Sequence, residues 1–461
     1  MNTKHIRHIV FLGIVLWAIP VGIFFVSQTL AGPIEIPSSF NPVGSGARAI
    51  GAGGAFIAVA DDATAASWNP AGLIQLRKPE FSVVTAGFYR GEDLEFGTNP
   101  DASGSNSVSD ANINYLSAAW PFELFNHNMI VSVSYQHLFD FSREWDFLLS
   151  ETEGSLRYRD DWQYEQSGSL SAVGVSYGVQ VIPEHLSAGI TFNFWEDSIT
   201  DNEWKQKYKR LRHGFQSSGD VSDTSQGETF TEYYNRTESY AFSGFNMNIG
   251  FLWDINDTWR IGAVLKTPFT ADIAYKKKTY TEKLYPERSE PPNIAAGLYN
   301  KSEELTMPMS YGIGVLYNYS ENLFFSADVY KTHWDDFEYK DEKGEKKSPL
   351  TGKPMEESQT DPTYQVRMGA EYLVFKDEKR AMAVPFRCGL FYDPAPAENS
   401  PDDYYGFSVG SGFTLNNRFS LDMAWQFRYG NDVGEYILKG MEFSQDVQEH
   451  MLYLSLIVYL F

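Results

Sequence analysis

The sequence predicts an all-β protein, a transmembrane barrel of fourteen antiparallel strands, on three observations. Hydrophobic residues make up only 43% of the 461 residues, while aromatic residues make up 16%. Together with a mean hydropathy of -0.34, this excludes a helical membrane protein, which needs runs of about 20 apolar residues. Apolar and polar residues alternate with period two along most of the chain, and no comparably long stretch has the 3.6-residue period of a helix.

The predicted strands are long enough to cross a bilayer at a tilt, which takes about ten residues. Strands of a soluble sandwich are nearer five or six residues. In the stretch 419–429 one face is apolar throughout, and the other carries Ser420, Asp422 and Arg428. The fourteen strands are centred on 80–89, 113–122, 129–141, 168–181, 186–198, 240–255, 259–275, 306–319, 323–337, 363–375, 384–392, 404–415, 419–429 and 448–461.

The connections alternate between short and long. Short turns are expected at 126–128, 183–185, 256–258, 320–322 and 416–418, and long polar links at 90–112, 142–167, 199–239, 276–305, 338–362 and 430–447. Short periplasmic turns opposite long external loops are typical of outer-membrane barrels, and an even strand number leaves both ends of the barrel on the periplasmic side. Backbone groups in lipid have no water partners, so the sheet must close on itself.

The first 31 residues predict an export signal. Lys4 and Arg7 precede an apolar stretch at 9–26, and small residues follow at 29–31. This order is typical of a secretory signal peptide cleaved after Ala31. A retained anchor is the competing interpretation because the apolar stretch is long, although Pro20 and Gly22 interrupt it.

Residues 32–77 are predicted to form an N-terminal hatch inside the lumen of the barrel, which spans 78–461. The stretch 41–73 is rich in Gly and Ala and buries too little apolar area to form a core of its own. Asp61 and Asp62 are expected to cap a short helix. Asn69 should end that helix, because the residue before a proline is steered away from the α region.

Several motifs carry a resemblance to a known family. They are the stretches 48–56 (RAIGAGGAF), 60–63 (ADDA), 69–73 (NPAGL), 307–314 (MPMSYGIG), 326–330 (SADVY), 367–372 (RMGAEY) and 387–394 (RCGLFYDP). In this order the sequence resembles the long-chain fatty acid transporter family of outer-membrane proteins, which includes aromatic-hydrocarbon uptake porins. The resemblance covers most of the chain after the signal peptide.

The resemblance implies a lumen plugged by the hatch and passive uptake of a hydrophobic compound, such as a long-chain fatty acid, that leaves sideways through the wall. The residues assigned to the hatch and its gating are Gly51, Gly53, Gly54, Asn69, Pro70, Ala71 and Gly72. An aromatic-hydrocarbon channel, a polar-solute porin and a structural or adhesive barrel remain as alternatives.

Side-chain parity yields candidate ligand contacts inside the lumen. An acyl chain gains about 0.8 kcal/mol for each CH₂ kept from water, so apolar patches are expected. The apolar candidates are Leu373, Phe391, Leu454, Leu456 and Val458. The candidates for binding a ligand carboxylate, for which a bidentate arginine is suited, are Lys266, Arg367, Arg387 and Arg428. Inward acids such as Asp328, Glu371 and Asp422 are the competing partners of these bases.

Aromatic and aliphatic residues in the links 142–167 and 199–239 are candidates for capturing cargo. They are Trp145, Phe147, Leu148, Leu149, Trp162, Trp204, Leu211 and Phe215. Outer-membrane lipids and lipopolysaccharide are the expected surroundings, and the terminal Phe461 is expected to be recognised by the outer-membrane assembly machinery.

Other function classes are disfavoured. A net charge of -23 argues against a nucleic-acid partner, which needs a basic face. The single Cys388 and the absence of a HExxH motif predict no metal site and no cofactor. An outer-membrane lipase is the best enzymatic alternative, but no nucleophile elbow or Ser–His pair can be placed, so no catalytic residue is assigned.

Overall fold

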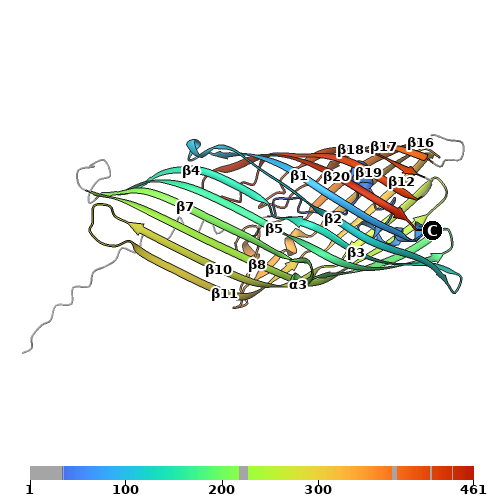
Figure 1. Cartoon of the computed structure of the whole chain (residues 1–461), viewed down its shortest axis with the longest axis horizontal. Helices are drawn as coiled ribbons and strands as arrows, with labels where there is room; N and C mark the ends of the chain where they lie inside the picture. Colours follow the sequence, from blue (N-terminus) through green and yellow to red (C-terminus); the bar gives the residue numbers. More distant parts are fainter. Residues whose placement is uncertain are drawn as a thin grey trace, which may run out of the picture.

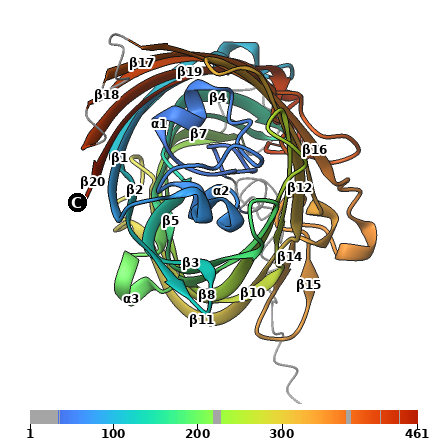
Figure 2. The same ribbon diagram turned by 90° about the vertical axis from the view of Figure 1, so that its right-hand side faces the viewer.

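The structure is a computed structural model that describes residues 34, 36–217, 227–375, 382–415, 418–438 and 440–460. Fourteen antiparallel strands pair in sequence order, and the last pairs with the first, Tyr459 lying opposite Glu80, so the sheet is a closed barrel (Figures 1 and 2). The fold-class prediction is confirmed. The signal peptide, Phe461 and the turn residues 416 and 417 lie outside the described residues. The barrel strands are β1 (Glu80–Phe96), β2 (Gly104–Leu124), β3 (His127–Asp140), β5 (Leu156–Ile182), β6 (Leu186–Trp195), β8 (Gly227–Asp254), β9 (Trp259–Lys266), β12 (Ser310–Ser320), β13 (Leu323–Thr332), β16 (Thr363–Phe375), β17 (Met382–Tyr392), β18 (Tyr405–Leu415), β19 (Phe419–Val433) and β20 (Phe443–Tyr459).

Alternation along the strands separates a lipid-facing surface from a buried inner face. On β19, Leu421 and Met423 are 41% and 53% exposed, whereas Ser420, Asp422 and Arg428 are buried. An outward apolar surface of this kind suits a bilayer. None of the helices in the described ranges has the length and apolar character needed to cross a membrane.

Four of the links expected to be long polar loops, at 90–112, 142–167, 199–239 and 276–305, are mostly strand, so that prediction was wrong. The outer halves of β5 and β8 continue beyond the barrel and pair with further strands, forming an open sheet in the order β4-β5-β7-β8-β10-β11. We call this sheet the extension; it lies at the end of the molecule away from the C-terminus (Figure 1). Its strands keep the period-two pattern, but Arg and Glu replace aliphatic residues, which made them look like loops. They are β4 (Arg143–Glu153), β7 (Glu203–Ser217), β10 (Phe269–Leu284) and β11 (Asn293–Met307), with the small strands β14 (Glu338–Lys340) and β15 (Lys346–Lys347) at the edge.

The described N-terminal residues up to 77, which we call the N-terminal segment, lie within the ring of strands (Figure 2). The segment contains α1 (Ala47–Gly51), α2 (Ala65–Trp68) and η1 (Pro70–Gln75). As the following proline predicts, α2 ends before Asn69, whose backbone is extended (φ -146°, ψ 104°). Small side chains such as Ala47, Ala65 and Ala66 are almost completely buried against the wall. The remaining short helices are η2 (Pro100–Ala102), α3 (Asp197–Thr200), η3 (Trp334–Asp336) and η4 (Met355–Glu357).

Candidate functional site

Residues 47–73, the seated part of the N-terminal segment, meet the wall backbone to backbone. A Cβ placed on Gly389 would lie 2.2 Å from the Gly53 nitrogen, and one on Gly369 would lie 2.1 Å from the Ala52 oxygen. On the opposite wall, a Cβ on Gly189 would lie 2.4 Å from the Pro70 carbonyl carbon. The contact therefore depends on wall glycines, since any side chain there would displace the segment.

The predicted hatch residues contribute to this contact with the wall in different ways. Gly53 (φ 72°) and Gly54 (φ 70°) have left-handed backbone conformations, which favour glycine. The Gly53 amide also donates to Ser408 Oγ at 3.0 Å. A Cβ on Gly51 would approach the Gly410 Cα to 3.1 Å, and one on Gly72 would approach the Ala60 oxygen to 2.2 Å.

Asn69 joins two parts of the segment to the wall. Its Nδ2 donates to the carbonyl of Ile57 at 2.9 Å and to that of Phe251 on β8 at 3.0 Å. Its Oδ1 accepts from the amide of Ala71 at 3.1 Å. Pro70 follows as the first residue of η1, and its backbone lies against Gly189. Asn69 is completely buried, so each of these bonds is shielded from water.

A series of ion pairs ties the seated part to the wall; its wall residues are buried, whereas the side chains of Arg48 and Asp61 are 21% and 33% exposed. Arg48 lies 2.6 Å from Asp61 and 3.0 Å from Glu371 on β16. Arg387 on β17 lies 2.5 Å from both Glu371 and Asp422. Burial raises the pKa of the nearby Asp62 carboxyl above its ordinary value, although Arg48 opposes the shift. Arg387 thus has two protein carboxylates as partners.

The other predicted carboxylate-binding bases also have protein partners. The Lys266 Nζ donates to the carbonyls of Pro42 and Val43 at 3.0 and 2.9 Å. Arg367 donates to the Gly53 carbonyl at 3.1 Å, and Arg428 forms an ion pair with Asp393 at 3.2 Å. All three bases therefore point inward and hold either the N-terminal segment or an inner-face acid.

Residues 36–46, the leading part of the segment, separate two cavities. The first has a volume of about 90 Å³ and the second about 100 Å³, and residues 41–43 line both. Trp334 closes one side of the first cavity, where its indole Nε1 donates to Asn41 Oδ1 at 2.8 Å and its ring lies 5.4 Å from that of Phe40. The first cavity has an apolar side formed by Phe40, Phe139, Trp195, Phe269, Met307 and Trp334, and a polar side formed by Gln136, Asn193, Asn246, Asn248, Lys266 and Gln365.

The apolar side of this cavity was not predicted from the sequence. Trp334 follows β13 in η3, within a stretch that was predicted as continuous strand. Trp195 and Phe269 lie on strands whose two faces are both partly apolar. Side-chain alternation alone therefore does not show that these residues point into the lumen. Two signals could have done so: the concentration of aromatic residues near the inner ends of the long links, and the Asn residues that alternate with them on 193 and 246–248.

One family model identifies the family of this chain. A family model described as outer membrane protein transport protein (OMPP1/FadL/TodX) matches residues 22–436. The chain belongs to this family. Its members are outer-membrane transport channels for hydrophobic compounds rather than enzymes, and the barrel described above is accordingly a multi-pass outer-membrane protein.

Solved structures share the fold of this FadL/TodX family member. A FadL homologue of Pseudomonas aeruginosa is 14% identical with a TM-score of 0.56, and the match covers 92% of this chain and 100% of that one. The toluene transporter TodX of Pseudomonas putida is 13% identical with a TM-score of 0.57, covering 91% and 99%. The CymD monoaromatic hydrocarbon channel is 15% identical with a TM-score of 0.50, covering 92% and 99%. No curated protein sequence matched the chain.

Three of the predicted apolar lumen residues of this family member face the wrong way. Leu454 and Leu456 are 44% and 40% exposed, and Val458 shares their outward face, so the prediction that they line the lumen was wrong. The inner face of β20 carries Tyr453, Ser455 and Ile457 instead. Both faces of this strand are apolar because one meets lipid and the other packs against the segment, where Ser455 Oγ accepts from the Ala47 amide at 2.7 Å.

The remaining two lie on the inner face without lining either cavity. Phe391 is buried, and the guanidinium of Arg367 lies 5.1 Å from its ring centre. Leu373 is half-buried near the turn that precedes β13, and its amide donates to Asn322. The structure thus uses Phe391 for packing against Arg367.

The aromatic residues predicted to capture cargo in this family member are already covered. Trp145, Phe147, Leu149 and Trp162 belong to a buried cluster in the extension that also contains Tyr436, Ile437, Leu438, Met441 and Phe443. Trp204 is completely buried and stacks on Phe141 with ring centres 4.8 Å apart. Leu148 and Leu211 are each 38% exposed on the outer face, and Phe215 is half-buried. The prediction that these residues lie in long loops was therefore wrong, because they belong to the paired strands β4, β5 and β7.

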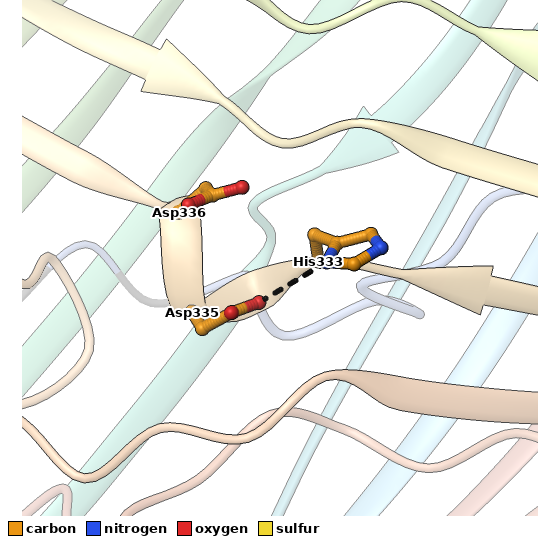
Figure 3. A group of neighbouring side chains, drawn as sticks. All are labelled: His333, Asp335 and Asp336. Carbon is orange, nitrogen blue, oxygen red and sulfur yellow. Dashed lines mark ion pairs between the residues drawn. The ribbon is translucent and has the colours of Figure 1, made fainter.

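One group of side chains in the described residues has the composition of a metal site. His333, Asp335 and Asp336 offer ligand atoms within 4.8 Å of one another at the surface beside η3 (Figure 3). His333 Nδ1 lies 3.6 Å from Asp335 Oδ1. His333 precedes η3, and Asp335 and Asp336 follow Trp334 within it.

Proposed function

We propose that this protein takes up hydrophobic compounds passively across the outer membrane, with residues 32–77 acting as a hatch. The observation that carries the proposal is the pair of cavities on either side of residues 41–43. The two cavities share Gln136 and Leu138 as well, so a small displacement of the leading part would join them into one passage along the wall.

The volume of the first cavity supports a moving hatch. An apolar cavity of about 150 Å³ accommodates benzene, whereas this one measures about 90 Å³. With Phe40 and Trp334 in contact, the cavity is thus smaller than one that accommodates an aromatic ring. Entry of cargo therefore requires the leading part to shift, whereas the seated part is held by backbone contacts and buried ion pairs.

The exit we propose is a weak place in the wall between β2 and β3, beside the second cavity. The pairing of β1 with β2 skips Asn114, and that of β3 with β5 skips Leu138. Paired residues between β2 and β3 stop at Tyr115 and Gln136. Beyond that point the strands are joined by long side-chain bonds, from Asn114 Nδ2 to the His137 carbonyl at 3.4 Å and between Asn112 and His137 at 3.5 Å.

Two bulges facing each other cost the wall its backbone hydrogen bonds locally. The Oδ1 atoms of Asn112 and Asn114 are buried without a hydrogen-bond partner among the described residues. Among the described residues, separating the strands beyond this point breaks two long side-chain bonds, which makes this place suited to lateral release of cargo into the membrane.

The cargo we propose is a long-chain fatty acid, with a monoaromatic hydrocarbon as the alternative. The solved relatives include toluene transporters and a monoaromatic hydrocarbon channel by name. The polar side of the first cavity, with Lys266 and three asparagines, favours a molecule with a polar group, since buried amides without partners are costly.

Uptake measurements test the proposal. Cells that produce the protein should accumulate labelled oleate or toluene faster than cells without it, and the faster cargo identifies the class. In planar bilayers the full chain should conduct weakly, whereas a variant lacking residues 32–73 should conduct as an open pore. Equal uptake with and without the protein contradicts the proposal, and high conductance of the intact chain would support a polar-solute porin.

A further inference from the structure

The outer face of the extension carries a recess near its tip, far from the cavities described above. It has a volume of about 560 Å³ and is formed by four neighbouring strands, β4, β5, β7 and β8. The volume lies within the range of about 300–1,000 Å³ found for small-molecule sites. Because the extension projects away from the end of the barrel that holds the C-terminus (Figure 1), the recess stands outside the lipid-facing band.

Strand register sets two rows of side chains next to each other in the recess. Arg159 pairs with Ser150 on one side and with His213 on the other, and Arg157 pairs with Phe215. His213 lies 3.5 Å from the hydroxyl of Thr231. The recess therefore combines two guanidinium groups, an imidazole, an aromatic ring and several hydroxyls on one face.

The two arginines of the recess differ from those on the opposite, buried face of the same strands. There Arg210 pairs with Glu232, and Arg212 pairs with Asp160 at 2.7 Å. Arg157 and Arg159 are exposed, and neither has an ion pair or side-chain hydrogen bond to another residue of the described ranges. Within the part of the chain that the structure describes, they are cations without partners on a protein whose net charge is -23.

Among residues 34–217 and 227–460 as far as they are described, the acids near the recess form no ion pair with these arginines. Glu287 accepts a hydrogen bond from Thr229 at the rim, and Asp161 follows two residues after Arg159 on the same face. Glu151 also lines the recess, but on β4 it alternates onto the other face, where Tyr158 donates to it. None of these carboxylates lies in an ion pair with the two arginines.

We infer that this recess binds an anionic saccharide, one that carries a phosphate or carboxylate group. A planar guanidinium binds such groups with two parallel hydrogen bonds. The hydroxyls of Ser150, Thr152 and Thr231 match the hydroxyls of a sugar, and the Phe215 ring offers a surface for its apolar face. Two sources carry this chemistry, the saccharide of lipopolysaccharide and a soluble sugar phosphate.

The test measures binding to the full chain in detergent by calorimetry, with glucose 6-phosphate, glucose and inorganic phosphate as probes. Glucose 6-phosphate should bind saturably and more tightly than either of the other two. The double variant Arg157→Ala/Arg159→Ala should weaken this binding about tenfold or more, as expected for the loss of charge-assisted hydrogen bonds. The matched control is Lys276→Ala/Lys278→Ala, which removes two exposed lysines from β10 outside the recess and should leave the affinity unchanged.

Purified lipopolysaccharide and its dephosphorylated form separate the two sources. Preferential binding of the phosphorylated form, lost in the arginine variant, assigns the site to the cell surface, and binding of glucose 6-phosphate alone assigns it to a soluble ligand. Absence of saturable binding by the wild type, equal loss in the lysine control, or equal affinity for phosphate and glucose 6-phosphate would overturn the inference. Oleate and toluene uptake should be unchanged in the arginine variant, so this test stands apart from the proposed transport function.

Discussion

The leading part and the seated part of the N-terminal segment are neighbours in sequence, yet the barrel holds them by different means. The seated part touches wall glycines with its backbone and joins a series of four ion pairs from Asp61 to Asp422, which is buried at its wall end. The leading part is held mainly through side chains around Asn41, which bonds to Trp334 and to the Pro394 carbonyl. Side-chain hydrogen bonds can be exchanged one at a time. The contacts between the segment backbone and the wall glycines, which form the seat of the segment, are instead lost together when the segment moves.

In the proposed hatch, this difference assigns closure of the lumen and exchange of cargo to two stretches of one segment. Close-packed interiors respond to change by discrete rearrangement rather than by gradual deformation. We propose that the backbone contacts with wall glycines keep the lumen closed to polar solutes, and that the adjoining cavities leave room for the leading part to move. We expect variants of the seat to affect closure and variants of the leading part to affect the exchange of cargo.

The largest effect is expected from Gly389→Val, which fills the seat. A Cβ at this position would lie 2.2 Å from the Gly53 nitrogen and 2.3 Å from its Cα, so the segment must leave the wall. The barrel should assemble, but single-channel conductance should rise toward that of a variant lacking residues 32–73. Gly91→Val is the control, because its Cβ would meet nothing closer than 3.9 Å. Conductance equal to the wild type would show that the seat is not what closes the lumen.

A smaller effect is expected from Glu371→Gln, which weakens the ion chain without filling space. Glu371 pairs with both Arg48 and Arg387, and removing one charge from a buried pair costs about 3 kcal/mol or more. The urea midpoint of unfolding in detergent should fall, while cargo exchange stays near the wild-type rate. The control Glu304→Gln removes an exposed pair with Lys340 and should cost less than about 1 kcal/mol. An equal shift in both variants would show that the ion pairs of Glu371 stabilise the protein no more than an exposed ion pair does.

Part of the fold and of the candidate site could be predicted from the sequence alone. The closed barrel of fourteen strands followed from the alternation, because each strand meets lipid on one face. The inward direction of Lys266, Arg367, Arg387 and Arg428 followed from the same parity. On β20 parity failed, since Leu454 and Tyr453 belong to two faces that are both apolar and sequence alone does not say which one meets lipid.

The cavities could not be predicted, because they depend on distant segments meeting in space. Asn41 contacts Trp334, Thr363 and Pro394, all of which are hundreds of residues away. The extension was missed for another reason. Its inner face is covered by stacked pairs such as Arg212 on Tyr158, 3.6 Å from the ring centre, so strands that carry charge on both faces resemble solvated loops in sequence.

A moderate effect is expected from Asn41→Ala, which loosens the leading part. The change leaves the indole N–H of Trp334 and the Pro394 carbonyl without this partner, at a cost of about 1–3 kcal/mol. Release of a bound fluorescent fatty acid should accelerate severalfold, with conductance unchanged. Asn300→Ala, an exposed change on β11, is the control. Raised conductance without faster release would contradict the division, because it would place closure in the leading part.

The smallest effect is expected from Lys266→Met, and it separates two roles of this lysine. Met keeps the apolar stem but loses the two hydrogen bonds to the carbonyls of residues 42 and 43. Because the variant no longer buries a charge, part of that loss is offset. The net loss of stabilisation should be about 1 kcal/mol or less. If Lys266 serves only to hold the leading part, oleate and toluene uptake should change by the same small factor. If it also pairs with a carboxylate, oleate uptake should fall while toluene uptake does not. Lys278→Met on the outer face of β10 is the matched control, and a fall in oleate uptake there as well would show that the loss of any one lysine charge is sufficient.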